Sequence, residues 1–153
     1  MIKLNIKKDK YIILELIPTN LKSKNGIIIQ LSALKINGLK LENRFDYRLN
    51  DNKLPIIEMK SIIDYDNEKF TYVDNEEDIL NDFKIFCEDY PIIIIDNIYT
   101  KEFLDIDNKI EYIYNYLNMS YSKDLIEQII SKYNLEPSNH IVDLLYEALM
   151  MEY

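Results

Sequence analysis

The chain has 153 residues, of which 48% are hydrophobic, so it is long enough for one core and too short for two ordinary domains. We therefore expect a single domain over residues 1–153. The apolar fraction and the charged fraction of 29% exclude a disordered chain, and the net charge of −9 argues against broad binding to phosphate backbones. Nucleic acid should bind weakly, and only through a local basic patch.

Cysteine usage and apolar runs predict the compartment. The single cysteine, Cys87, cannot form an internal disulfide, and it falls within the apolar pattern of a helix face, which favours a reducing environment. The lysine-rich start is not a secretion signal, because Glu15 interrupts the apolar stretch that follows it. No apolar run approaches the roughly 20 residues that a membrane helix needs. We expect an acidic, soluble, cytoplasmic protein with no membrane partner.

The first third of the chain predicts three strands. Residues 10–17 read KYIILELI, an apolar and β-branched run typical of a buried strand. A second apolar run covers residues 26–36, and Asn37-Gly38 follows it as a two-residue hairpin signal. Residues 39–49 then alternate between apolar and polar side chains. The second and third strands should therefore pair antiparallel.

The middle of the chain predicts an alternation of helices and strands. Residues 55–72 are irregular, and we expect a short helical turn and a loop there. Asp74 and Glu77 resemble a capping box at the start of a helix that ends near Asp89. Residues 91–95 form a short apolar run typical of a central strand, and a helical pattern begins near Thr100. This alternation indicates parallel pairing.

The last third predicts two more helices. Apolar residues between Leu125 and Tyr133 recur at helical spacing, with Ser122 as a candidate N-cap. A closing helix follows from Ile141, with Ser138 or Asn139 as its cap. The predicted order is β-β-β-α-β-α-α-α.

Four segments carry a resemblance to a known family. They are YIILELIPTNL (11–21), GIIIQLSALKINGLKLENRFDYRLN (26–50), NEEDILNDFKIFCEDYPIIIIDN (75–97) and IISKYNLEPSNHIVDLLYEAL (129–149). Together they resemble the DEDDh 3′-to-5′ exonucleases, whose members include the DnaQ-like proofreading epsilon subunits. The resemblance implies an α/β, ribonuclease-H-like exonuclease fold, in which three antiparallel strands and a parallel strand form a mixed sheet flanked by helices.

The same resemblance implies a site that has lost most of its ligands. In that family four carboxylates converge on two divalent metals, Mg²⁺ or Mn²⁺, which activate water for phosphodiester cleavage. Aligning the motifs places Glu15 on the family's first Asp and His140 on its general base. The other three ligand positions carry Ile17, Lys101 and Leu145. We therefore expect no bound metal and no other cofactor.

Alternatives remain for each candidate residue. A rearranged metal site could use Glu15, Asp96 and Asp143, with His140 as the base. Glu15 could equally be a strand-end carboxylate, and His140 a contact at a helix start. Lys101 could pair with Glu15 or Asp96 and fill the former site, or pair with other groups at the surface. Tyrosines alternate at 112, 114 and 116, and in a helix that alternation would place them on two packing faces rather than on one base-stacking platform.

The leading hypothesis is a catalytically inactive exonuclease-like domain, a pseudoenzyme that acts as a binding or regulatory module. It predicts a protein partner or self-association, with weak nucleic-acid binding at most. The alternatives are a metal-dependent 3′-to-5′ exonuclease with a rearranged site and a nucleic-acid binder that does not cleave. The residues Ile17, Lys101 and Leu145 favour the first hypothesis.

Overall fold

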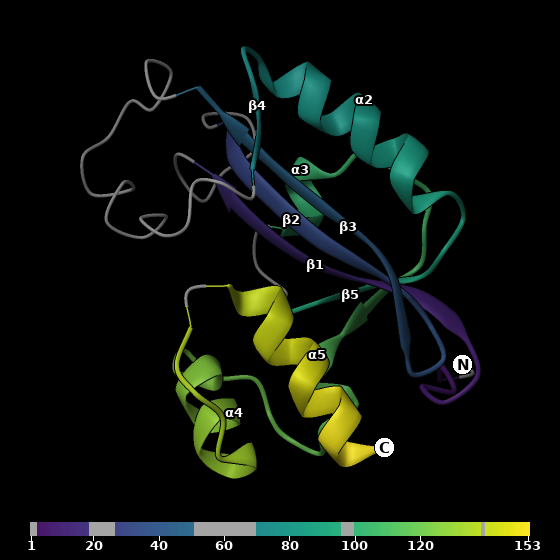
Figure 1. Cartoon of the computed structure of the whole chain (residues 1–153), viewed down its shortest axis with the longest axis vertical. Helices are drawn as coiled ribbons and strands as arrows, with labels where there is room; N and C mark the ends of the chain where they lie inside the picture. The colour runs from purple at the N-terminus through teal and green to yellow at the C-terminus, as the bar shows by residue number, and fades with distance from the viewer. Residues whose placement is uncertain (1–2, 19–26, 51–69, 96–99, 139) are drawn as a thin grey trace.

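A six-stranded sheet organises the protein (Figure 1). The computed structural model describes residues 3–18, 27–50, 70–95, 100–138 and 140–153. The strand order is β4-β3-β2-β1-β5-β6. The strands are β1 (Lys10–Pro18), β2 (Ile28–Asn37), β3 (Lys40–Leu49), β4 (Thr71–Val73), β5 (Ile92–Ile94) and β6 (Ile110–Tyr112). The helices are α2 (Glu76–Cys87), α3 (Thr100–Phe103), the 3₁₀ turn η3 (Ile113–Asn115), α4 (Leu125–Tyr133) and α5 (Ile141–Glu152).

The strand pairing confirms the predicted mixed sheet. β1, β2 and β3 pair antiparallel, and β5 lies parallel to β1 and to β6, so it is interior to the sheet as its apolar run predicts. Gly38 closes the hairpin between β2 and β3 with a φ of 66°, a left-handed conformation that glycine adopts without strain. The prediction of a parallel strand after an antiparallel meander is therefore confirmed.

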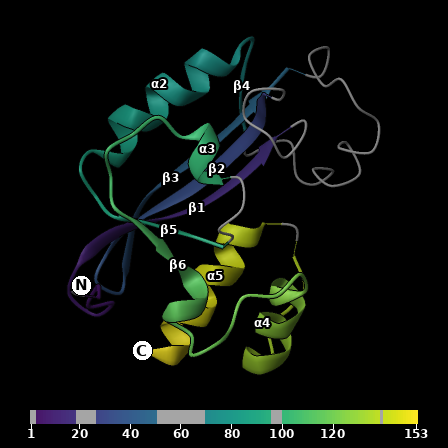
Figure 2. The same cartoon turned by 180° about the vertical axis from the view of Figure 1, so that it is seen from behind.

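Helices cover the two faces of this sheet, and each face has its own core (Figures 1 and 2). On the side that α2 covers, alternate residues of β1 pack against Ile79 and Phe83 of the helix. On the other side, which α5 and α4 cover, the intervening residues of β1 pack against Leu145 and Leu149. We refer to these as the α2 side and the α5 side.

Two predictions about local structure are wrong. The irregular stretch that we assigned to a turn and a loop lies mostly outside the described residues, but it ends in a strand at Thr71, where β4 pairs with β3. The helix predicted from Thr100 stops after one turn at Phe103. The strand β6 follows, and its backbone pairs with the outer edge of β5, which would otherwise lack hydrogen-bond partners. Tyr112 and Tyr114 are thus not helical neighbours, and their rings stack with centroids 5.5 Å apart.

The helices α2 and α5 start within one or two residues of their predicted first residues. The cap of α2 is Asn75 rather than Asp74, because the Asn75 side chain accepts the hydrogen bond from the Asp78 amide. Ser138 accepts a bond from the amide of His140, the residue that precedes α5. Within the described residues, no helix is both long and apolar enough to cross a bilayer.

Candidate functional site

A row of polar side chains crosses the sheet beneath the start of α5. In the strand register Glu15 of β1 faces Ser32 of β2, and Ser32 faces Asp46 of β3. Directly opposed residues of antiparallel strands project to the same face, so the three side chains share the α5 side. Ser32 is only 2% exposed and the side chain of Asp46 only 7%. The row is therefore largely removed from solvent.

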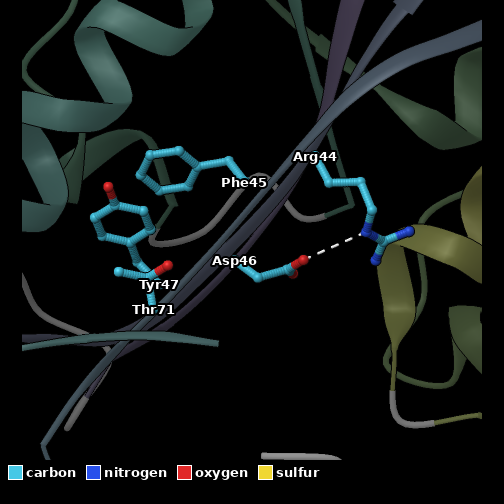
Figure 3. Close-up of a pocket in the computed structure, with 5 residues that line it drawn as sticks. All are labelled: Arg44, Phe45, Asp46, Tyr47 and Thr71. Atoms are coloured by element: carbon cyan, nitrogen blue, oxygen red, sulfur yellow. Dashed lines mark hydrogen bonds and ion pairs between the residues drawn. The ribbon is translucent and has the colours of Figure 1, made fainter. Parts of the chain in front are cut away.

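Arg44 joins this row to α5. Its guanidinium donates from Nη1 to Asp143 Oδ1 at 2.7 Å and from Nη2 to Asp143 Oδ2 at 3.2 Å. Nε donates to Asp46 Oδ2 at 3.3 Å, as the dashed line in Figure 3 marks. This is the paired geometry in which arginine holds a carboxylate most firmly. Both oxygens of Asp143 are thus occupied by a cation from the protein itself.

Glu15 is the unusual carboxyl of the row. Oε1 is shielded from solvent, although part of the residue reaches the surface. Burial, and then the charges of Asp46 and Asp143, raise the pKa of Glu15 to about 8. At neutral pH most molecules therefore carry this group as the neutral acid. Among the described residues, no hydrogen-bond partner reaches Glu15 Oε1, Ser32 Oγ or Asp46 Oδ1.

His140 lies at the edge of the same cluster. It is the residue before α5, and its Nδ1 is 3.8 Å from Asp143 Oδ2. Its ring lies 6.3 Å from that of Phe70, and the Arg48 guanidinium lies 4.2 Å from the Phe70 ring. His140 thus immediately precedes α5, but its side chain makes no capping hydrogen bond and approaches the Asp143 carboxylate instead.

The structure brings together some of the predicted residues and not others. Glu15, His140 and Asp143 converge, while Asp96 lies outside the described residues. Ile17 and Leu145 are buried in the apolar cores, as their side chains dictate. Lys101 does not pair with Glu15, because it lies on α3 with Nζ 5.3 Å from the ring of Tyr112. Of the alternatives for Lys101, the pairing with Glu15 does not occur and the pairing with Asp96 lies outside the described residues; the cation in the cluster is Arg44.

Sequence reasoning missed Arg44 and Asp46. The side chains of β3 alternate about the strand, so that Arg44 and Asp46 point toward α5 while Phe45 and Tyr47 point toward α2 (Figure 3). A cavity of about 570 Å³ runs along this strand, bordered by these four residues and Thr71. The strand register of the folded chain brings Asp46 into the cluster, because it aligns Asp46 with Glu15 through Ser32.

The cluster does not fit a pair of divalent metals. Arg44 holds both oxygens of Asp143 and contributes a positive charge, while Ile17 and Leu145 offer no oxygen. Within the described ranges, no three or more His, Cys, Asp or Glu side chains are arranged to hold a metal ion. The arrangement is a carboxylate cluster in which Arg44 and the proton on Glu15 offset two of the three acidic groups, leaving one net negative charge.

Solved structures of exonuclease I are similar in fold to this chain. Exonuclease I bound to the inhibitor BCBP superimposes with a TM-score of 0.59 at 12% identity, over 95% of this chain and 41% of that one. The zinc-bound E. coli ExoI–ssDNA complex gives 0.57 at 12% identity, over 95% and 40% of the respective chains. An ExoI/SSB-Ct complex gives 0.59 at 12% identity, over 95% and 40%.

These similarities establish the fold. At this low sequence identity the matches show the fold alone. It is the ribonuclease-H-like exonuclease fold that the sequence predicted. The chain spans about two fifths of the exonuclease I chains that it matches. No protein-family model matches the sequence, and no curated protein does.

Proposed function

We propose that this chain is a non-catalytic exonuclease-like domain of DEDDh ancestry that acts by binding. The observation that carries the proposal is the double hydrogen bond from Arg44 to Asp143, which fills the carboxylate cluster with an internal cation. Because Arg44 already balances the charge of Asp143, this carboxylate has little affinity for Mg²⁺ or Mn²⁺. Without metals, a base at His140 has no activated water on which to act.

The proposed role is that of a regulatory module with a protein partner or a second copy of itself. Support comes from the structural neighbours, since the similar part of exonuclease I is also present in complexes with SSB. An exonuclease fold can therefore coexist with protein binding. The match covers 40% of the exonuclease I chain, so the activity of the whole enzyme is not assigned to this protein.

A nuclease assay tests the absence of catalysis. Micromolar protein is incubated with 5′-labelled single-stranded DNA and RNA in Mg²⁺ or Mn²⁺, with EDTA as the blank. We expect no shortening of either substrate. Divalent-dependent shortening that disappears in Glu15→Ala but persists in Asp107→Ala, an exposed acid outside the cluster, would overturn the proposal. Shortening that survives both substitutions identifies a contaminating nuclease, and the preparation is then purified further and assayed again.

The convergence of three acidic side chains favours one second candidate, an exonuclease with a rearranged site. Asp46 and Asp143 both lie near enough to Glu15 to raise its pKa. If they bound Mn²⁺, a concentration of 100 times the dissociation constant would stabilise the fold by about 2.7 kcal/mol. That corresponds to a rise of about 5 to 10 °C in Tm for a domain of this size.

We expect no such rise in Tm. A saturable rise that is lost in Glu15→Ala and Asp143→Ala but kept in Asp107→Ala would favour the rearranged enzyme. The variant Arg44→Ala sharpens the test, because it frees both oxygens of Asp143. If Arg44 is what excludes the metal, Mn²⁺ should stabilise Arg44→Ala and leave the wild type unchanged.

A further inference from the structure

Lysines gather at the end of the sheet where the chain begins and the β2–β3 hairpin turns. Figure 1 shows the N-terminal segment beside this hairpin. The Gly38 amide donates to Asp9 O at 2.8 Å, and a Cβ at Gly38 would lie 2.6 Å from Lys7 O, so the two segments are in close contact. We call the four exposed lysines of these segments the hairpin-end lysines. They are Lys7, Lys8, Lys10 and Lys40.

Neighbouring acids neutralise the charges of the hairpin-end lysines only in part. None of the four forms an ion pair with any described residue, whereas nearby Lys35 bonds to Glu88 at 2.9 Å. Lys10 lies 5.9 Å from the Tyr90 ring centroid and, after Lys35, its charge also contributes to the lowered pKa of Glu88. Asp9, which lies between Lys8 and Lys10 in the sequence, accepts a bond from the Asn5 amide at 2.7 Å. In a chain of net charge −9, this end therefore carries a local excess of positive charge.

We propose that the hairpin-end lysines form a binding surface for the phosphodiester backbone of single-stranded nucleic acid. Exposed ammonium groups attract phosphates, and the neighbouring side chains of Asn5 and Asn37 add polar donors. The only large apolar side chain exposed at the described hairpin is Leu39, at 43%. One leucine offers too little apolar area to anchor the protein in a bilayer, so the composition favours a soluble polyanion over a membrane.

This surface is separate from the carboxylate cluster. Lys10 begins β1 and Glu15 lies five residues along the same strand, a distance of about 17 Å at the usual rise. The cluster is acidic and would repel phosphates, while the hairpin end attracts them. The inference therefore goes beyond the proposed function and holds whether or not the cluster cleaves anything.

The number of lysines sets the expected strength and salt dependence. Four phosphate contacts give a slope of log K against log salt of about −3 for a single strand. Raising the salt from about 50 to 150 mM should then weaken binding roughly 20-fold. At physiological salt the dissociation constant should lie in the range of about 10⁻⁶ to 10⁻⁴ M, as expected for an acidic protein with one basic patch.

Fluorescence anisotropy with 5′-fluorescein-labelled oligo(dT) in EDTA provides the test. Lys7→Glu/Lys40→Glu is compared with Lys101→Glu/Lys123→Glu, which changes exposed lysines on α3 and before α4. Both double variants alter the net charge by the same amount. We expect the hairpin-end variant to lose at least 10-fold in affinity and half of the salt slope, and the control variant to lose less than 3-fold. Circular dichroism establishes that both variants are folded.

Three results would overturn the inference. Equal losses in the two variants would mean that only net charge matters. Absence of binding by the wild type at about 50 mM salt and 200 μM protein, well above the expected dissociation constant there, would mean that the lysines do not form a binding surface. Tighter association with vesicles of phosphatidylserine and phosphatidylcholine than with oligo(dT) would assign the surface to a membrane instead.

Discussion

The two sides of the sheet use the same strands for different purposes. On the α2 side, alternate residues of β1 are apolar along its whole length and pack on Phe45 and Phe83. On the α5 side, β1 is apolar at Tyr11 and Ile13 and then becomes polar at Glu15, where the charged cluster begins. The α2 side thus resembles an ordinary core, while the α5 side combines a core with a charged cluster. The stability of the apolar core and the properties of the cluster are therefore separable by mutation.

The largest effect should come from the α2 side. Phe83 is fully buried and its ring meets that of Phe45 at a centroid distance of 5.6 Å. Phe83→Ala should lower the free energy of unfolding by about 3 to 5 kcal/mol, because it removes the buried ring and leaves a cavity. Ile85→Ala on the same helix is the control, since Ile85 is 77% exposed and should change stability by less than about 0.5 kcal/mol. Urea unfolding measures both, and similar losses would show that α2 does not pack as described.

The next effect should come from the charged cluster. Arg44→Met keeps much of the side-chain volume but leaves Asp46 and Asp143 without their cation. We expect a loss of about 1 to 3 kcal/mol, below the value for a fully buried ion pair, because the Arg44 side chain is 34% exposed. Lys40→Met on the same strand is the control and should be nearly neutral. A neutral Arg44→Met would mean that the bonds to Asp143 are not formed in solution.

The sequence predicted the architecture because its strongest signals are local. The apolar run of β1, the Asn37-Gly38 turn and the apolar run of β5 each suffice to place a strand. Three antiparallel strands followed by a helix and a parallel strand then leave few possible topologies. The short strands β4 and β6 escaped prediction, since neither carries a continuous apolar run like that of β5, which is equally short.

The charged cluster could not be predicted because it depends on a bulge. Counting evenly from the pair Asn37–Lys40 would place Ser32 opposite Phe45, but the register shifts near Lys35 and places Ser32 opposite Asp46. One extra residue in β3 thus exchanges the two faces of the strand beyond it. The exchange buries Phe45 on the α2 side and directs Asp46 toward Glu15. An uninterrupted alternation in the sequence gives no indication of this shift.

Glu15 gives the prediction that is most specific to one carboxyl, and its effect on stability over a single pH unit is the smallest of the three. Its pKa is about 8 in the folded protein and 4.5 in the unfolded chain, so between these values the folded state binds the extra proton. Proton uptake by the folded state means that its stability falls as pH rises through that window, by at most about 1.4 kcal/mol per pH unit. Below pH 4.5 both states are protonated and the contribution is constant.

The variant Glu15→Gln isolates this contribution, because the carboxyls outside the cluster are common to both proteins. The stability of Glu15→Gln relative to the wild type should therefore increase from pH 5.5 to 8 and level off above pH 8.5. Urea midpoints at half-unit intervals give the difference directly. Glu127→Gln, an exposed position on α4, should show no such trend. A flat difference for Glu15→Gln would mean that Glu15 is ionised in the folded protein, and that the cluster carries one negative charge more than its geometry implies.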